Sequence, residues 1–344
     1  MPMTTSGDIS LRTAGYISKK LLERAQPLLC LSRFGQAKPL PRNVGRSMKF
    51  RGYEHLPNQP KPLTEGVTPS ASKPTYRDVE AVIKQFGDWI ELTDVLADTH
   101  EDPLIPEFTD ILGEQSAIML ERIIAGVLLG GTNVHFAGRD AAGVIATGRD
   151  GVNQPLTLAV QRRVMRGLRR QNAQRITSVV SASPNFNTSP IPPSFIAVAH
   201  TDLEQDIREM PGFVPTEKYG SYKPLDGEVG SVEGVRYILT TILDPWQDAG
   251  AAPLAGTVVE SNEGACADVY PVLFFGKNAY GTIPFAKNGR NGASPVTPMV
   301  LNPNVPRGGD PLAQRGSIGW KAYQSAVILY DMYMARVECA ATKY

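Results

Sequence analysis

The strongest repeat of apolar residues along the chain predicts one long helix over residues 103–131. Apolar side chains recur there at intervals of three and four, which places them on one face of a helix. Gly130 and Gly131 follow and are expected to end it. At about 1.5 Å per residue, such a helix spans on the order of 35–40 Å. The residues expected along its apolar stripe are Phe108, Ile111, Leu112, Ile118, Ile123 and Leu129.

The polar stretch "DTHEDP" comes directly before this helix and has two interpretations. Asp102 followed by Pro103 is typical of an N-cap residue with proline at the first helical position. Alternatively, Asp98, His100 and Asp102 bind a metal ion, as in a metal-dependent hydrolase. Three ligands so close together rarely form a complete shell, and no distant cluster of His, Cys or Asp stands out to complete it. We therefore expect a helix cap.

Residues 46–92 read as a long two-stranded arm. A first strand over 47–56 is followed by a loop tip over 57–74 that is dense in Pro, Gly, Ser and Thr. A second strand over 75–92 alternates in polarity, and Gly87 within it indicates a bend or a bulge. Such a hairpin has little core of its own and is marginal in water, so the pattern indicates a partner. The residues expected to share one face of the second strand are Val79, Ala81 and Ile83.

A second, basic helix is predicted over residues 157–172. Val160, Val164 and Leu168 form its apolar stripe. No Asp or Glu occurs between Asp150 and Asp202, so the segment is locally basic. Its arginines fit contact with nucleic-acid phosphates, but they equally fit a solvated face or ion pairs with acids elsewhere. The arginines in question are Arg162, Arg163, Arg166, Arg169 and Arg170.

The rest of the chain alternates short elements, which predicts an α+β fold. A short helix is expected over 9–25. Beyond residue 176, apolar runs predict strands over 194–200, 230–241, 268–276 and much of 319–341. Between them, residues 201–210 predict a helix that begins with a capping box. The two residues of that box are Thr201 and Glu204.

Composition and motifs argue against an enzyme. The 344 residues carry a net charge of +1, so any contact with nucleic acid must come from a local patch. Three scattered cysteines match neither a zinc site nor a disulfide framework. No signal peptide, membrane span, nucleotide-binding loop or nucleophile motif is found. His200 beside Asp202 suggests acid–base chemistry only superficially, so we expect no catalytic site, metal or cofactor.

Several separated phrases resemble the major capsid proteins of N-four-like podophages. They occur in the same order from about residue 7 to 340 and include "GDISLRTAGY", "FGQAKPLPRN", "LTDVLADTHEDP", "VAHTDLEQDIREMPGFVP", "DVYPVLFFGKNAYG" and "DPLAQRGSIGWK". The resemblance implies the α+β capsid fold of the Hong Kong 97 type. It also implies a non-enzymatic head protein that forms hexamers and pentamers in an icosahedral shell around double-stranded DNA.

The resemblance further implies a division of the chain. Residues 1–45 would be an N-terminal arm, 46–92 an extended E-loop, and 93–175 a P-domain with its spine helix and the basic helix. Residues 176–285 would form the A-domain and 286–344 would return to the P-domain. Candidate inter-subunit residues on the E-loop are Arg51, Tyr53, Glu65 and Arg77.

The implied partners are other copies of the chain, a scaffolding protein, a portal, decoration proteins and packaged DNA, which the arginines at 162–170 would face. Assembly is expected in the bacterial host cytoplasm, and the product in the virion. A metal-dependent hydrolase and a free-standing nucleic-acid binder remain as alternatives.

Overall fold

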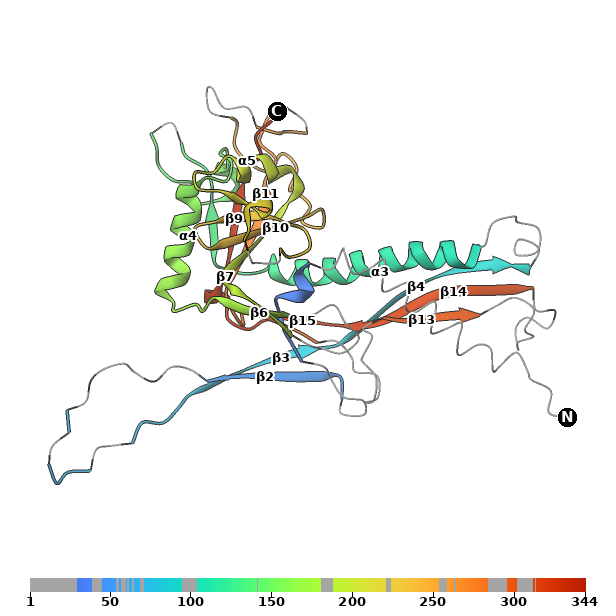
Figure 1. Ribbon diagram of the computed structural model, residues 1–344, viewed down its shortest axis with the longest axis horizontal. Helices are drawn as coiled ribbons and strands as arrows, with labels where there is room; N and C mark the ends of the chain where they lie inside the picture. The colour runs from blue at the N-terminus through green and yellow to red at the C-terminus, as the bar shows by residue number, and fades with distance from the viewer. Residues whose placement is uncertain are drawn as a thin grey trace.

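The computed structural model describes most of the chain, namely residues 30–38, 45–53, 56, 60, 62–63, 65–68, 71–94, 104–140, 142–180, 188–220, 224–253, 259–262, 264–283, 296–301, 312 and 314–344. The expected helix at 9–25 and the residues Asp98, His100, Asp102 and Pro103 lie outside these ranges, so the helix cap stays a prediction. The molecule is elongated: a long helix and a narrow sheet extend from a main body of one large sheet with its helices, and a two-stranded ribbon extends in the opposite direction (Figure 1).

An eight-stranded mixed sheet forms the main body. Both of its faces are buried, so its inner strands read as continuous apolar runs rather than alternating ones. In "FIAVA", for example, Phe195 and Ala197 face one core while Ile196 and Val198 face the other. In order across the sheet, the strands are β5 (Val134–Phe136), β16 (Met334–Cys339), β11 (Tyr270–Phe275), β7 (Thr188–His200), β10 (Val235–Thr240), β9 (Glu228–Val232) and β8 (Val214–Pro215), with β6 (Ile176–Val180) paired to β7.

Helices cover the two faces of this sheet. On one face lie α4 (Leu158–Arg170), the 3-10 turn η4 (Thr201–Leu203) and α5 (Glu204–Arg208), and on the other lie the end of α3 (Leu104–Leu128) and the turn η2 (Leu31–Arg33). The basic helix therefore packs on the same sheet as residues 188–275, through Val164, Met165 and Leu168. The assignment of this helix to a P-domain of residues 93–175 stays a prediction. The remaining 3-10 turns are η3 (Arg149–Gly151), η5 (Thr216–Lys218) and η6 (Asp331–Tyr333).

The long helix α3 leaves the main body and runs along a second sheet of three strands (Figure 1). The strands are β13 (Val296–Leu301), β14 (Arg315–Gln324) and β4 (Lys84–Thr93). Leu112 and Leu120 of α3 are buried against Trp320 and Ile318 of β14. Ile111, expected on the apolar stripe, is instead exposed. Leu112, also expected on the stripe, is buried.

The two-stranded arm in the structure is shorter than the one predicted over residues 46–92. Only β2 (Ser47–Tyr53) and β3 (Tyr76–Val82) pair with each other, and they extend away from both larger sheets. After Ile83 the chain continues as β4, which pairs with β14 instead. At the base of the β2–β3 ribbon, Val79, Ala81 and Ile83 do lie on its more buried face, as expected. A small sheet of β1 (Gln36–Ala37), β12 (Tyr280–Thr282) and β15 (Ala326–Ile328) lies beside it.

Two local expectations are wrong for physical reasons. Gly87 makes no bulge, because the β4–β14 register runs through it without a shift. A Cβ there would lie 2.6 Å from the carbonyl oxygen of Trp320, so close backbone approach explains the glycine. The expected strand 230–241 is a hairpin, in which β9 and β10 are joined at Glu233 and Gly234.

Glu121 ties the start of the described chain to the middle of α3. Its side chain is fully buried, and its carboxylate accepts hydrogen bonds from the backbone N–H groups of Leu31 (2.6 Å) and Ser32 (3.0 Å). Tyr280 donates its hydroxyl to the carbonyl of Leu31. Burial raises the pKa of Glu121, and the two backbone hydrogen bonds only partly oppose this. An acid within a buried helix face was not a feature that hydrophobic periodicity predicted.

A pH titration of stability tests this environment. The folded protein holds the Glu121 proton to higher pH than the unfolded chain does, so Glu121 becomes unfavourable as pH rises between the two pKa values. The free energy of unfolding of the wild type minus that of Glu121→Gln should therefore fall from about pH 4 upward and then level off. Urea unfolding of both proteins at several pH values measures it. A difference that grows with pH would show that the hydrogen bonds outweigh burial.

Candidate assembly and nucleic-acid interface

The β2–β3 ribbon presents polar and aromatic side chains to solvent. Arg51 lies directly across from Asp78 and forms a two-point ion pair with it, with N–O distances of 2.8 and 2.9 Å. The guanidinium also lies 4.4 Å from the centre of the Tyr76 ring. Arg51 lowers the pKa of Asp78 through these hydrogen bonds. Arg51 is thus engaged within its own ribbon.

The other three E-loop candidates are exposed. Tyr53, at the end of β2, keeps 66% of its surface exposed and its cross-strand partner Tyr76 keeps 59%. Arg77 and Glu65 are exposed as well. Large aromatic surfaces on a two-stranded ribbon are unusual unless something packs on them. The ribbon therefore has the character of a contact surface, and among the described residues Tyr330 lies close to it at Gly52.

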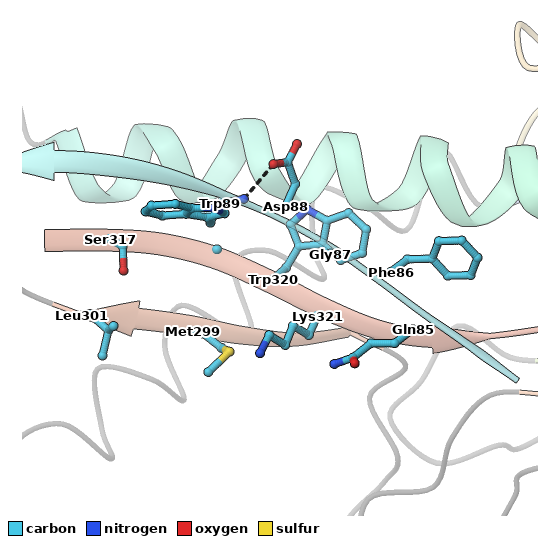
Figure 2. A pocket seen from close by; sticks show the side chains of 11 residues that line it. Gln85, Phe86, Gly87, Asp88, Trp89, Met299, Leu301, Ser317, Trp320 and Lys321 are labelled. Carbon is cyan, nitrogen blue, oxygen red and sulfur yellow. Dashed lines mark hydrogen bonds between the residues drawn. The ribbon is translucent and has the colours of Figure 1, made fainter. Parts of the chain in front are cut away.

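A second contact surface lies on the sheet of β13, β14 and β4, on the face turned away from α3. Trp89 of β4 and Trp320 of β14 show the difference between the two faces: Trp320 is 1% exposed and donates its indole N–H to Gln115 of α3 at 3.2 Å, whereas Trp89 is 61% exposed. Figure 2 shows Trp89 on β4 and Met299 and Leu301 on β13, with β14 between the two strands; all three residues line the same shallow groove. We call this surface the Trp89 face. The Pro- and Gly-rich sequence around β13 gave no signal for it.

The five arginines of the basic helix do not act alike. Arg162 binds Glu233 through both of its carboxylate oxygens, with Nε at 3.1 and 3.0 Å. Arg163 folds back and donates to the carbonyl of Phe136 at 2.8 Å. Arg166, Arg169 and Arg170 are exposed and make no hydrogen bond or ion pair within the described part of the chain. Together with Arg162, whose side chain is 61% exposed, these arginines form the outer surface of α4, which lies at the edge of the main body in Figure 1.

No catalytic arrangement is found among the described residues. His200 is the N-cap of η4: its Nδ1 accepts from the backbone N–H of Asp202 at 3.2 Å, so the expected Thr201 cap is wrong. Asp202 is held by the hydroxyl of Tyr270 at 2.9 Å. The described ranges contain no group of three or more His, Cys, Asp and Glu that could hold a metal ion. None of the described helices is long and apolar enough to cross a membrane.

The fold is that of phage capsid subunits of the Hong Kong 97 type. The capsid of Ralstonia phage GP4 matches with a TM-score of 0.65 at 11% identity, covering 90% of this chain and 88% of that one. The head of Helicobacter pylori bacteriophage KHP40 matches with 0.57 at 13% identity, covering 91% and 88%. The capsid of cyanophage Pam1 matches with 0.55 at 14% identity, covering 93% of each chain.

The sequence itself gives the family. Residues 76–329 match the family described as phage capsid protein, and the chain belongs to this family. No protein of curated function matches it. The matched segment begins at β3 and ends after β15, so it includes the Trp89 face, α3, α4 and most of the main body.

The two tryptophans offer a matched test of the two faces of the narrow sheet. Trp320→Ala removes a buried side chain and should destabilise the subunit by about 3–5 kcal/mol. Trp89→Ala removes an exposed one, so urea unfolding of the subunit should change little, while assembly of particles should be lost or strongly reduced. A Trp89→Ala subunit that is as destabilised as Trp320→Ala would mean that Trp89 serves the fold of its own chain.

Proposed function

We propose that this protein is the major structural subunit of an icosahedral phage head. Copies associate as hexamers and pentamers into a closed shell that encloses double-stranded DNA. The observation that carries the proposal is the pair of unpartnered surfaces at opposite parts of an elongated subunit, the outer β2–β3 ribbon and the Trp89 face. Family membership supports the same conclusion.

These two surfaces are suited to head-to-tail contact between neighbours. The ribbon extends from one side of the molecule and the Trp89 face lies on the narrow sheet that extends from the other, so one subunit cannot join its own two surfaces. A contact between different surfaces of identical chains forms a ring when the rotation closes. We propose that the ribbon of one subunit lies on the P-domain of the next, with Tyr53, Arg77 and Glu65 available for contact.

In this proposal the structural units take the roles that the resemblance implies. The ribbon, with its loop, is the E-loop. The helix α3 with the sheet of β13, β14 and β4 is the core of the P-domain. The eight-stranded sheet with α4 and α5 is the A-domain, which gains β16 from the C-terminal segment and α4 from the segment before residue 176. The role is structural rather than enzymatic.

The proposed partners follow from this role. A separate scaffolding protein guides assembly, a portal occupies one vertex, and decoration proteins bind the finished shell. Subunits assemble in the cytoplasm of the bacterial host and end in the virion. The exposed arginines of α4 contact the packaged DNA without sequence preference, because they offer charge to phosphates rather than a pattern of base contacts.

Shortening the ribbon tests the shell proposal. Replacement of residues 57–74 by a short Gly-Ser turn leaves the β2–β3 ladder from Ser47–Val82 to Tyr53–Tyr76 in place. The subunit should keep its circular dichroism and melting temperature. Sedimentation of the subunit co-expressed with the scaffold should show that closed particles are lost. Ordering the backbone costs about 1–2 kcal/mol per residue, so in the proposed shell contact with a neighbouring subunit must offset this cost, and the shortened ribbon would lack that contact. Wild-type yields of closed particles would contradict the proposed role of the ribbon.

The exposed arginines allow a separate test of the DNA contact. Arg166→Gln with Arg170→Gln should leave folding and shell assembly unchanged, because both side chains point away from the core. Shells should retain less DNA, and the loss should be greater at high salt because screened phosphate contacts weaken further. DNA content per purified particle measures this. Failed assembly with normal DNA content in the remaining particles would show that these arginines bind neighbouring subunits.

A further inference from the structure

Glu233 is the acid that the structure places on the arginine surface of α4. It sits in the two-residue turn between β9 and β10, where Val232 pairs with Val235. Its carboxylate binds Arg162, and Arg169 also attracts it. The pKa of Glu233 is lowered, first by the hydrogen bonds from Arg162. The Glu233 carboxylate therefore partly neutralises the positive charge of Arg162, which it binds directly, and of Arg169.

The backbone of this turn does not favour glutamate. Glu233 has φ of 48° and Gly234 has φ of 82°, which is the pattern of a turn that prefers Asn-Gly or Asp-Gly. Glutamate is disfavoured at positive φ, because its side chain crowds the backbone and gains no local hydrogen bond. A residue that breaks a local rule indicates that its side chain has a role elsewhere.

A buried hydrogen-bond bridge fixes the turn against the helix. Gln161, fully buried on α4, donates its amide to the carbonyl of Val232 at 2.9 Å. It accepts from the hydroxyl of Tyr237 on β10 at 2.8 Å. Val232, which precedes Glu233, is therefore held by Gln161, which precedes Arg162. The bridge fixes the backbone of the turn beside α4, and this places the Glu233 side chain, which is 41% exposed, within reach of Arg162.

We propose that Glu233 is a built-in counter-charge that limits how tightly the arginine surface of α4 binds the phosphates of double-stranded DNA. This inference rests on the proposed function. In a shell, many copies of this surface meet the same polyanion, and weak contacts multiply through multivalency. A single strong site per subunit would hold DNA immobile. The Glu233 carboxylate keeps each contact weak by competing with phosphate for Arg162 and Arg169.

The test measures DNA binding by the full-length, unassembled subunit. A labelled 20-base-pair duplex is titrated at several salt concentrations, and binding is followed by fluorescence anisotropy. Glu233→Asn should bind roughly three- to tenfold more tightly than the wild type, and its salt dependence should be steeper by about one phosphate contact. The same substitution should not lower the melting temperature, because Asn-Gly suits the turn. Glu233→Gln, which removes only the charge, should give the same gain.

Glu204→Gln is the matched control, because it removes an exposed acid from an Arg208 ion pair on α5 and changes the net charge equally. Its DNA affinity should stay close to the wild-type value. Adding Arg162→Gln to Glu233→Asn should cancel most of the gain. Equal affinity of Glu233→Asn and Glu204→Gln would overturn the inference while leaving DNA contact intact. Loss of all duplex binding in every protein, or preference for polyglutamate over the duplex, would overturn the proposed DNA contact and the inference with it.

Discussion

The narrow sheet of β13, β14 and β4 has two faces, and among the described residues one helix, α3, packs on one of them. On the side of α3, Trp320 and Leu112 are buried in a common core. On the other side, Trp89, Met299 and Leu301 remain exposed, and no described element lies over them. A three-stranded sheet with a single covered face loses part of the apolar burial that stabilises larger sheets. We therefore propose that a neighbouring subunit covers the Trp89 face in the assembled shell.

The main body has no such requirement. Its eight-stranded sheet is covered on both faces, by α4 and α5 on one and by α3 and η2 on the other. The same helix α3 belongs to both regions, since its C-terminal part packs on the main sheet while its N-terminal part lies on the narrow one. Glu121, bound to the backbone at Leu31 and Ser32, fixes the described start of the chain to that helix. The main body thus supports two exposed surfaces that we propose are covered on assembly.

Sequence patterns predicted the helices and strands better than they predicted which strands pair and which faces are covered. Hydrophobic patterns predicted the long helix, the basic helix and the buried strands of the main sheet. Helical periodicity and continuous apolar runs can both be recognised within a short stretch of sequence. The pairing of β4 with β14 was not predicted, since the two strands lie far apart in the chain and nothing local distinguishes an arm from a sheet strand. Trp89 was missed for a similar reason: alternation shows that two faces exist, but not which one a helix covers.

The arginine helix shows the same limit for function. Its positive charge was evident from the sequence, and it fitted either contact with nucleic acid or ion pairs and a solvated face. The sequence could not show which arginine takes which role. The structure shows Arg162 paired with Glu233 and Arg163 bound to a backbone carbonyl, while Arg166, Arg169 and Arg170 are exposed. Contact of these arginines with DNA stays a prediction. Glu233 lies far from α4 in the chain, and only the hairpin β9–β10 brings it there. The Glu121 contact likewise joins residues far apart in sequence.

A cryo-electron microscopy map of particles assembled from this chain would test the central claim most directly. The account predicts closed shells in which a neighbouring subunit covers the Trp89 face and the β2–β3 ribbon is ordered against another copy. Closed shells with the Trp89 face open to solvent and the ribbon free of any neighbour would contradict it.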